Sequence, residues 1–481
     1  MQVQPLNRRH WIRSAVSATA MTALGGGLSR GMESAGDPAV GRQSAVPLVA
    51  DLSKNLYRVK LEMEIEGNIK LPRNPLVSKE TASRVPVRSQ ATLDWEERVL
   101  GFAEDRTGHV AERYYHSANS SGTVGKREQT LTLRPQSRLL RIRREDQQWQ
   151  FHSPDSYLDG QELELVQVPA SSLAVDGLLP TAAVAEGDSY QPDREVLAKL
   201  LSLAAVQSST VEGQIHKLES ESAQIHFKGK VEGSVSGVPT TIDLVAKLTF
   251  DREQQVVTWL VLAIREHRET GKLKPGFEIA GTIRMIRKPL SAPVRLPATA
   301  ADDWDREVPA ERLLTELNSP AVGYAVLMDR RWKIMTDVAG ASMMRMIDND
   351  LGVAQCNLRP LGKMAAGAQL TLEAFVAQSQ RSMGERFSEV LQSREEVNES
   401  GLRVLRATIQ GVVQGVPVQW IFVQFSDDHG RRLLATITIG NDHLDTFAGA
   451  DEQLARSLRF LPLNDETFDV ASQAAPRTGV Q

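Results

Sequence analysis

The clearest pattern in the chain is a strict alternation of apolar and polar residues from position 57 to position 66. Tyr57, Val59, Leu61, Met63 and Ile65 alternate with charged side chains. Because successive side chains of a strand point to opposite faces, this period of two predicts a β-strand with one buried and one solvated face. The same alternation recurs in the segments QTLTLRPQSRLLRIRRE, QELELVQVP, AQIHFKGKVEGSV and TIDLVAKLTFDREQQVVTWLVLAIREH. Its repetition predicts an antiparallel sheet.

One segment of this region has a helical period instead. Pro192 and Asp193 form a helix start, and the apolar residues that follow share one helical face: Val196, Leu197, Leu200, Leu201 and Ala204. We expect a curved antiparallel sheet wrapped on this helix, in a domain over 46–288. The pattern of residues 50–290 resembles the half-barrel proteins of the LolA and LppX families. That resemblance implies an apolar cavity for a lipid or another hydrophobe. The alternative, which we favour, is that the helix fills the sheet's inner face.

A proline-rich stretch follows this domain. Pro289, Pro293 and Pro297 lie among small and polar residues up to position 305. Each proline removes a backbone donor and biases the preceding residue away from helix. Residues 289–305 are therefore predicted to be a linker that makes few contacts.

The second domain is predicted over 306–464. The segment QLTLEAFVAQSQRSMGERF has helical spacing, and GLRVLRATIQG and GVPVQWIFVQFSDDHGRRLLATITI form a strand meander. Ile421, Val423 and Phe425 share one strand face, while Trp420 and Phe422 share the other. A strand that is apolar on both faces must be covered on both sides, and we expect helices to do so. The last helix contains Leu454 and Leu458 and is capped by Asp451.

This order of elements is similar to the PsbP/Mog1 family over residues 308–463. The likeness is carried by GVPVQWIFVQFSDDHGRRLLATITI and by DEQLARSLRFLP. It implies a small binding or assembly module and transfers no functional residue. The fold class expected for the whole chain is α+β: two β-rich domains, the second an antiparallel sheet covered by helices, followed by a disordered tail at 465–481.

A short motif occurs once in each predicted domain. G-x-V-x-G-V-P begins at Gly233 and again at Gly411. It indicates either duplicated units or the same hairpin solution reached twice, because a tight turn between strands demands glycine. We favour the repeated hairpin.

The beginning of the chain has the pattern of an export signal. Arg8, Arg9 and Arg13 precede an apolar, small-residue run over 15–28, which is shorter than the ~20 residues that span a bilayer. Arg-Arg-x-aromatic-apolar-Arg resembles the twin-arginine signal; an ordinary secretory signal is the alternative. Residues 1–45 are predicted to be signal peptide and spacer, with the cleavage site open between the region of 27–29 and Ala35.

Composition narrows the functional classes. The chain has 481 residues, 41% of them hydrophobic, and a net charge of -4. This small negative charge supplies no basic field for nucleic acid. The single cysteine, Cys356, has no partner within the chain for a disulfide.

Catalytic motifs are not found. The sequence contains no G-x-S-x-G elbow, H-E-x-x-H or phosphate-binding loop, and none of its nine histidines pairs with another at ligand spacing. Two polar clusters that could form metal or acid–base sites are interpreted as a turn and a helix start: Asp427–Asp428–His429, and Asp442–His443 with Asp445. Asp348 and Asp350 suggest calcium, but their loop lacks the remaining ligands. Cys356 is interpreted as a packing residue, and the arginine run at 138–145 as a solvated sheet face. No catalytic, cofactor-binding or metal-binding residue is predicted.

These patterns predict an exported, non-enzymatic binding or scaffolding protein of the bacterial periplasm or cell envelope. Its expected partner is an envelope protein or a hydrophobic ligand, without nucleic acid and without a stable transmembrane segment once the signal is removed. The alternatives are a carrier of a lipid or other hydrophobe in the first domain, and a hydrolase with a dispersed site.

Overall fold

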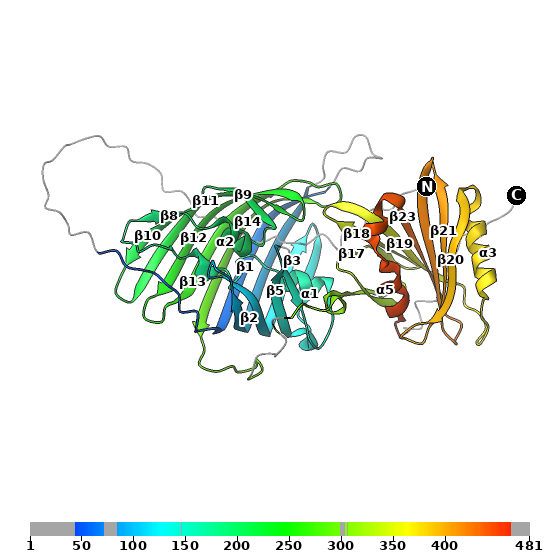
Figure 1. The fold of residues 1–481 in the computed structure, drawn as a ribbon, viewed down its shortest axis with the longest axis horizontal. Coiled ribbons are helices and arrows are strands. Elements are labelled where there is room, and N and C mark those ends of the chain that lie inside the picture. Colours follow the sequence, from blue (N-terminus) through cyan, green and yellow to red (C-terminus); the bar gives the residue numbers. More distant parts are fainter. Residues whose placement is uncertain (1–43, 72–83, 146, 299–303, 305, 463–481) are drawn as a thin grey trace. The chain divides into compact units, whose positions relative to one another are not determined.

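The computed structural model describes residues 44–71, 84–145, 147–298, 304 and 306–462 (Figure 1). The predicted signal and most of its spacer, and the predicted tail, lie outside these residues. The chain divides into two compact units. The N-terminal unit contains the described residues within 44–156 and 161–308, and the C-terminal unit contains those within 157–160 and 309–462.

The N-terminal unit is built on a 13-stranded sheet whose main path runs β6-β5-β3-β2-β1-β14-β13-β12-β11-β10-β8. Strand β1 (Leu56–Lys70) pairs antiparallel with both β2 and β14, and its predicted alternation is confirmed because Tyr57, Val59, Leu61, Met63 and Ile65 are all buried. The other strands are β2 (Arg84–Phe102), β3 (Gly108–Val124), β4 (Arg127–Thr132), β5 (Leu139–Glu145), β6 (Gln148–His152), β8 (Ser189–Tyr190), β9 (Ala205–Ser209), β10 (Glu212–Leu218), β11 (Ser222–Val235), β12 (Val238–Asp251), β13 (Val256–Arg268) and β14 (Gly276–Pro289). We call the face that carries Leu61 the inner face.

The repeated G-x-V-x-G-V-P motif forms the same two-residue hairpin turn in each unit. Ser236 and Gly237 join β11 to β12 with φ of 50° and 83°. Gln414 and Gly415 join the corresponding strands of the C-terminal unit with φ of 50° and 82°. Positive φ at both central residues defines the type I′ turn, whose twist matches that of the flanking strands. The motif is thus explained by turn geometry alone.

Three short elements from the stretch between β6 and β9 pack on the inner face. They are α1 (Gly160–Val166), the 3₁₀ turn η3 (Val175–Leu178) and α2 (Arg194–Leu201). The helix predicted from Pro192 is present but short, because Ser202 adopts a left-handed φ of 56° and ends it before Ala204. The prediction of a strand at QELELVQVP is wrong. Its alternation coincides with a short helix, α1, in which Leu163, Leu165 and Val166 are buried.

Residues 290–298, called the proline segment, are hydrogen-bonded to the sheet. The prediction that this stretch is a linker with few contacts is therefore wrong for these residues. The buried Glu96 carboxylate accepts hydrogen bonds from the backbone N–H groups of Val294, Arg295 and Leu296 at 2.8–3.1 Å. Arg98 donates to the carbonyl of Pro297 at 2.6 Å. Burial alone would raise the pKa of Glu96, but the backbone donors outweigh it and hold this pKa below its ordinary value.

Replacing Glu96 with alanine is expected to release the proline segment. Three backbone donors lose a charged acceptor, a bond class worth about 1.5–3 kcal/mol each, so trypsin should cleave at Arg295 at least about tenfold faster. Because the folded pKa of Glu96 is lowered, the attachment is present above the ordinary carboxyl pKa and is lost as the pH falls through the folded pKa. The control is the rate of trypsin cleavage in Glu128→Ala, a variant at an exposed position. A cleavage rate that is unchanged in Glu96→Ala would contradict the role of Glu96 in holding the proline segment.

The C-terminal unit contains a seven-stranded antiparallel sheet in the order β17-β18-β19-β23-β22-β21-β20 and a four-stranded sheet in the order β24-β16-β15-β7. The seven strands are β17 (Trp332–Val338), β18 (Ala341–Asp348), β19 (Leu351–Leu361), β20 (Phe387–Val397), β21 (Arg403–Val413), β22 (Val416–Ser426) and β23 (Arg432–Gly440). The smaller sheet has β7 (Leu158–Asp159), β15 (Thr315–Ser319), β16 (Tyr324–Met328) and β24 (Arg459–Phe460). Strand β7 precedes the rest of its sheet by about 150 residues and pairs parallel with β15.

Both faces of the seven-stranded sheet are covered, as the two apolar faces of β22 predict. Trp420 and Phe422 pack with α3 (Leu372–Met383) on one face. Val423 and Phe425 lie on the other face, under α4 (Leu444–Phe447), α5 (Ala450–Ser457) and strands of the smaller sheet. Asp451 is not the cap of α5, because Gly449 holds that position; Asp451 is buried and forms an ion pair with Arg406 of β21.

The α+β class predicted for the chain is wrong: the fold is mostly β. Its largest elements are antiparallel sheets, and the longest α-helix in the described residues has 12 residues. Helices therefore cover only parts of the C-terminal sheet, and β15 and β16 complete one cover. The periodicity of apolar residues overestimates the helix content here, because the apolar stripe continues in the sequence beyond the residue at which the helix ends. None of the helices in the described ranges is long and apolar enough to cross a membrane.

Candidate functional site

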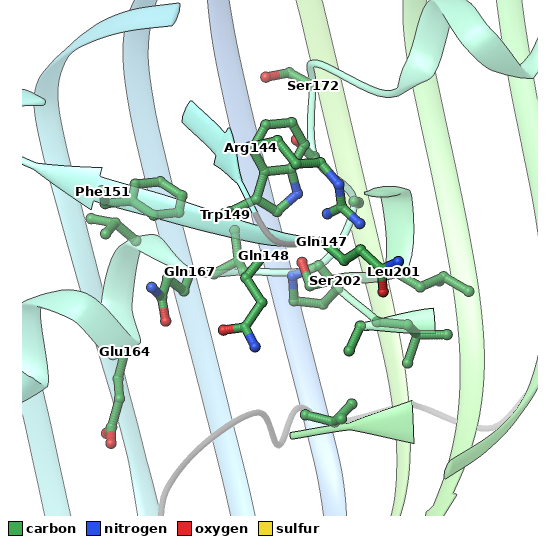
Figure 2. A pocket seen from close by; sticks show the side chains of 18 of the residues that line it. Arg144, Gln147, Gln148, Trp149, Phe151, Glu164, Gln167, Ser172, Leu201 and Ser202 are labelled. Carbon is green, nitrogen blue, oxygen red and sulfur yellow. The ribbon is translucent and has the colours of Figure 1, made fainter. Parts of the chain in front are cut away.

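The inner face of the N-terminal unit holds a cavity of about 150 Å³ (Figure 2). Strands β1, β2, β12 and β13 form its floor, and the turn before β6, the end of α1, residues 167–172 and residues 201–204 form its walls. The apolar lining residues include Leu61, Trp95, Trp149, Phe151, Val166, Leu201, Leu203, Ile242 and Ile264. The period of two in the strands places the floor residues on this face.

Local backbone geometry shapes the walls. The left-handed Ser202 turns the chain at the end of α2, so that Leu203 donates its N–H to the carbonyl of Ala198 at 2.9 Å. Ala170 also has a positive φ, of 62°, and donates to the carbonyl of Leu200 at 2.7 Å. These bonds join residues 167–172 to the end of α2 and hold both segments at the cavity.

A buried polar network closes one side of the cavity. The Arg113 guanidinium donates to Glu97 Oε2 at 2.6 Å and to Ser172 Oγ at 3.0 Å, and lies 4.9 Å from the centre of the Trp95 ring. Ser172 Oγ in turn donates to Glu97 Oε2 at 2.8 Å. Burial alone would lower the pKa of Arg113, but the Glu97 carboxylate outweighs it and raises this pKa. The charges of Arg113 and Glu97 therefore balance each other.

A second arginine–glutamate pair lies further along the cavity, on β13. Arg268 donates to Glu266 Oε1 at 2.5 Å, and both side chains are buried. The guanidinium also lies 5.0 Å from the centre of the Phe277 ring. This pair, like the first, neutralises its own charge within the protein.

The third arginine of the cavity differs from the other two. Arg144 is the second last residue of β5, and its guanidinium lies 5.4 Å from the centre of the Trp149 ring. Its Nη2 is buried and has no hydrogen-bond acceptor among the residues that the structure describes. Burial lowers the pKa of Arg144 from its ordinary value. The interpretation of the arginine run at 138–145 as a solvated face is therefore wrong for this side chain.

The polar clusters weighed in the sequence do not come together. Asp427 accepts hydrogen bonds from the N–H groups of His429 and Arg431 at 3.0 and 2.8 Å, which makes this cluster a hairpin turn. Asp442 and His443 lie in the 3₁₀ turn η6 (Asn441–His443). Within the described residues, no group of three or more histidine, cysteine, aspartate or glutamate side chains is arranged to hold a metal ion.

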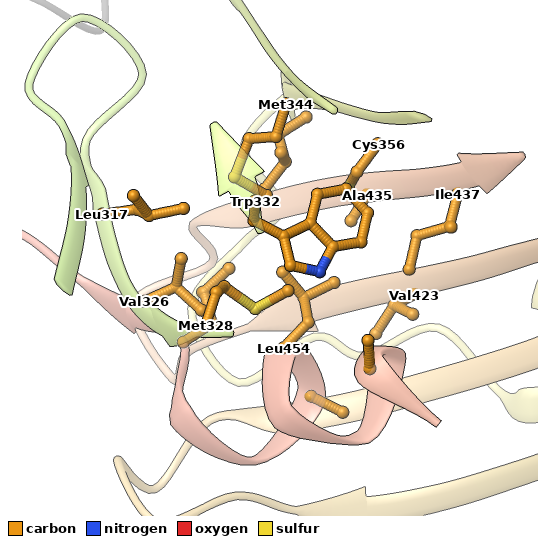
Figure 3. Close-up of a cluster of buried hydrophobic side chains, with 14 of the residues drawn as sticks. Leu317, Val326, Met328, Trp332, Met344, Cys356, Val423, Ala435, Ile437 and Leu454 are labelled. Atoms are coloured by element: carbon orange, nitrogen blue, oxygen red, sulfur yellow. The ribbon is translucent and has the colours of Figure 1, made fainter. Parts of the chain in front are cut away.

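Asp348 and Cys356 also have structural positions. Asp348 precedes the turn between β18 and β19, where Asn349 and Asp350 both have positive φ. Cys356 is buried in the core around Trp332 (Figure 3), and burial raises the pKa of its thiol. A buried thiol with a raised pKa is a poor nucleophile, which agrees with its interpretation as a packing residue.

The structure brings one histidine pair together that the sequence does not show. His216 and His226 lie on the neighbouring strands β10 and β11 with their rings stacked 4.0 Å apart. A β-bulge between Ile215 and Lys217 accompanies this pairing. The register of a bulged strand cannot be read from residue spacing, because the extra residue shifts the pattern.

The C-terminal unit has a second hollow, of about 440 Å³. Thr408, Ile421 and Ile439 of the sheet and Leu444 and Phe447 of α4 line it. The ion pair of Arg406 and Asp451 lies at its base. Both of these side chains are buried, so the pair joins α5 to β21 in addition to shaping the hollow.

No family model matches the chain, and no curated protein matches it. Solved structures that it is similar to include cyanobacterial PsbP from Synechocystis sp. PCC 6803, at 14% identity, covering 34% of this chain and 98% of that one, with a TM-score of 0.25. A Pseudomonas aeruginosa protein of unknown function, PA94, is 12% identical over 31% of this chain and 99% of its own, with a TM-score of 0.22. A lipovitellin structure is 8% identical over 51% of this chain, with a TM-score of 0.27, and the match spans 26% of the lipovitellin chain.

A PsbP protein is thus among the solved structures that the chain is similar to, and PsbP/Mog1 is the family that residues 308–463 are predicted to resemble. The resemblance of residues 50–290 to LolA and LppX stays a prediction. The site is therefore interpreted from its own residues.

Proposed function

We propose that this chain is an exported, non-enzymatic binding protein that holds a small hydrophobic ligand at the inner face of its N-terminal unit. The cavity of about 150 Å³ carries the proposal. An engineered protein cavity of that volume stays dry and binds benzene, so this one fits an apolar group of about six carbon atoms. Export is proposed from the arginine and small-residue pattern of residues 8–28.

A binding role is proposed in preference to catalysis because a hydroxyl and two carboxylates of the cavity wall are already engaged with neighbouring side chains. The Ser172 hydroxyl donates to Glu97 and accepts from Arg113, so it is held in a structural network. The two arginine–glutamate pairs satisfy each other and leave the apolar surface of Trp149, Phe151 and Leu201 for a ligand.

The proposal is tested by titrating the full chain with 1-hexanol and benzyl alcohol in a calorimeter. Saturable binding with one site is expected. The variant Ala204→Leu adds apolar atoms at a lining position and should weaken binding at least about tenfold, while a control at the exposed Val245, Val245→Ala, should not change it. Absence of saturable binding by the natural chain would contradict the proposal.

A scaffolding role is the second candidate, and it is supported by the tip of the β21–β22 hairpin. Val412, Val413 and Val416 are 41%, 36% and 56% exposed on either side of a two-residue turn. Exposed apolar clusters of this kind mark contacts with other proteins. A photo-crosslinking amino acid at position 413 should capture one defined envelope protein, and the product should disappear when Val412 and Val416 are changed to serine; a crosslink that persists would count against this role.

A further inference from the structure

Three arginine side chains line the cavity, and two of them are paired with a glutamate. Arg113 is neutralised by Glu97, and Arg268 by Glu266. The Glu164 carboxylate, which also lines the cavity, has interactions of its own in the structure. Arg144 lines the same cavity, and no acceptor for its buried Nη2 is found in the described part of the chain. A buried donor without an acceptor is unfavourable, and a charged one more so.

The neighbouring Trp149 ring positions the guanidinium group of Arg144 at the cavity. The group lies 5.4 Å from the centre of the Trp149 ring, a distance at which a cation and an aromatic face attract. The Trp149 indole is itself fixed, because its Nε1 donates to the carbonyl of Lys199 at 3.2 Å. Figure 2 shows Arg144 and Trp149 beside Gln147 and Ser202, which also line the cavity.

A planar guanidinium matches the geometry of an oxyanion. It donates parallel hydrogen bonds to two oxygen atoms of a carboxylate or a phosphate, which an ammonium group does not do. Glu195 and Asp105 act on the Arg144 charge from a distance, and Asp105 forms its ion pair with Lys199. An oxyanion at Arg144 would therefore supply an acceptor for Nη2 and a counter-charge at contact distance. The apolar walls formed by Phe151, Leu201 and Leu203 would then hold the rest of the ligand.

We infer that the cavity selects small amphiphiles with an oxyanion bound by Arg144 and an apolar part of about six carbon atoms. This inference rests on the proposed function and specifies the class of its ligand. Arg144 is the residue that sets the preference for an anion, since the other two guanidinium groups already have carboxylate partners.

The test compares hexanoate, hexyl phosphate and 1-hexanol on the full chain by calorimetry at fixed ionic strength. At least one of the two anions should bind about tenfold or more tightly than the alcohol. Arg144→Gln should remove this advantage and leave the affinity for 1-hexanol unchanged. Arg144→Lys should recover part of it, because it keeps the charge and loses the planar fork. Arg127→Gln removes the same charge at an exposed position on β4 and should have no effect.

The outcomes separate the inference from the function on which it rests. If no probe binds, the proposed function itself fails. If 1-hexanol binds as tightly as both anions, or Arg144→Gln keeps the preference for the anion, the function stands and the assignment of Arg144 is overturned. Thermal unfolding of each variant establishes that it is folded before its affinity is compared.

Discussion

Replacing Asp176 with alanine is expected to lower the free energy of unfolding of the N-terminal unit by about 3–5 kcal/mol, because it leaves a buried arginine without its counter-charge. Asp176 lies in η3, and its carboxylate accepts from Arg287 of β14 at 2.9 Å. Both side chains are almost fully buried, at 3% and 1% exposed. This pair joins the segment on the inner face to the middle of the sheet.

Among the described residues, no second carboxylate forms an ion pair with Arg287 that could replace Asp176. The guanidinium lies 3.6 Å from the centre of the Tyr57 ring, and burial raises the pKa of Tyr57 to about 12, so its hydroxyl stays neutral. Urea unfolding followed by tryptophan fluorescence measures the loss. Asp243→Ala, at an exposed position on β12, is the control. A double variant, Asp176→Leu with Arg287→Met, should recover much of the stability, since apolar replacement of a buried ion pair is often neutral; equal effects of Asp176→Ala and Asp243→Ala would contradict the account.

Replacing Trp332 with alanine is expected to cost about 3–5 kcal/mol in the C-terminal unit. Trp332 is fully buried on β17 and lies among Met328, Met344, Cys356 and Leu454 (Figure 3). Its ring meets that of Phe447 edge-on, with centres 6.4 Å apart. Removal of a large aromatic group leaves a cavity that the surrounding sheets cannot close.

Calorimetry of the full chain measures this effect and tests the independence of the two units. Trp332→Ala should lower the melting temperature of the C-terminal unit only. Asp176→Ala should lower that of the N-terminal unit only. Val338→Ala, at an exposed position on the same strand, should change neither by more than about 0.5 kcal/mol. We expect the two units to fold independently; if either variant shifts both transitions equally, they unfold together and this expectation is wrong.

Strands with one buried face are predicted well from this sequence. Alternation in β1 and β11 and the two apolar faces of β22 agree with burial in the structure, because side-chain direction in a strand depends only on residue parity. The turns at Gly237 and Gly415 are also recognisable, since a type I′ turn restricts its residues strongly.

Other features depend on contacts that local patterns do not contain. Strand β7 has two residues and exists because Thr315 and Glu316 pair with it from far along the chain. The short helix α1 has the alternation of a strand. The proline segment is held by the carboxylate of Glu96, about 200 positions earlier in the chain. Burial of a charged side chain by distant elements has no signature in the sequence.

The candidate site is the part that the sequence predicts least. The sequence implies an apolar cavity only through the LolA-like resemblance. Arg144 belongs to an arginine run that the sequence predicts to be a solvated sheet face. The signal that could have identified it is the sequence RRE-DQQWQF, where two arginines precede a tight turn and an aromatic strand. Strands joined by such a turn bring Arg144 and Trp149 opposite each other, as the pairing of β5 with β6 shows.

The most direct test of the proposed function is ¹⁹F NMR of the full chain labelled with 5-fluorotryptophan. The chain has seven tryptophans; Trp95 and Trp149 line the cavity, while Trp332 and Trp420 belong to the cores of the C-terminal unit. Hexanoate should shift the Trp149 and Trp95 signals in a saturable way and leave those of Trp332 and Trp420 unchanged. Saturating ligand that moves neither Trp149 nor Trp95, or that moves only the tryptophans of the C-terminal unit, would contradict a ligand site at the inner face.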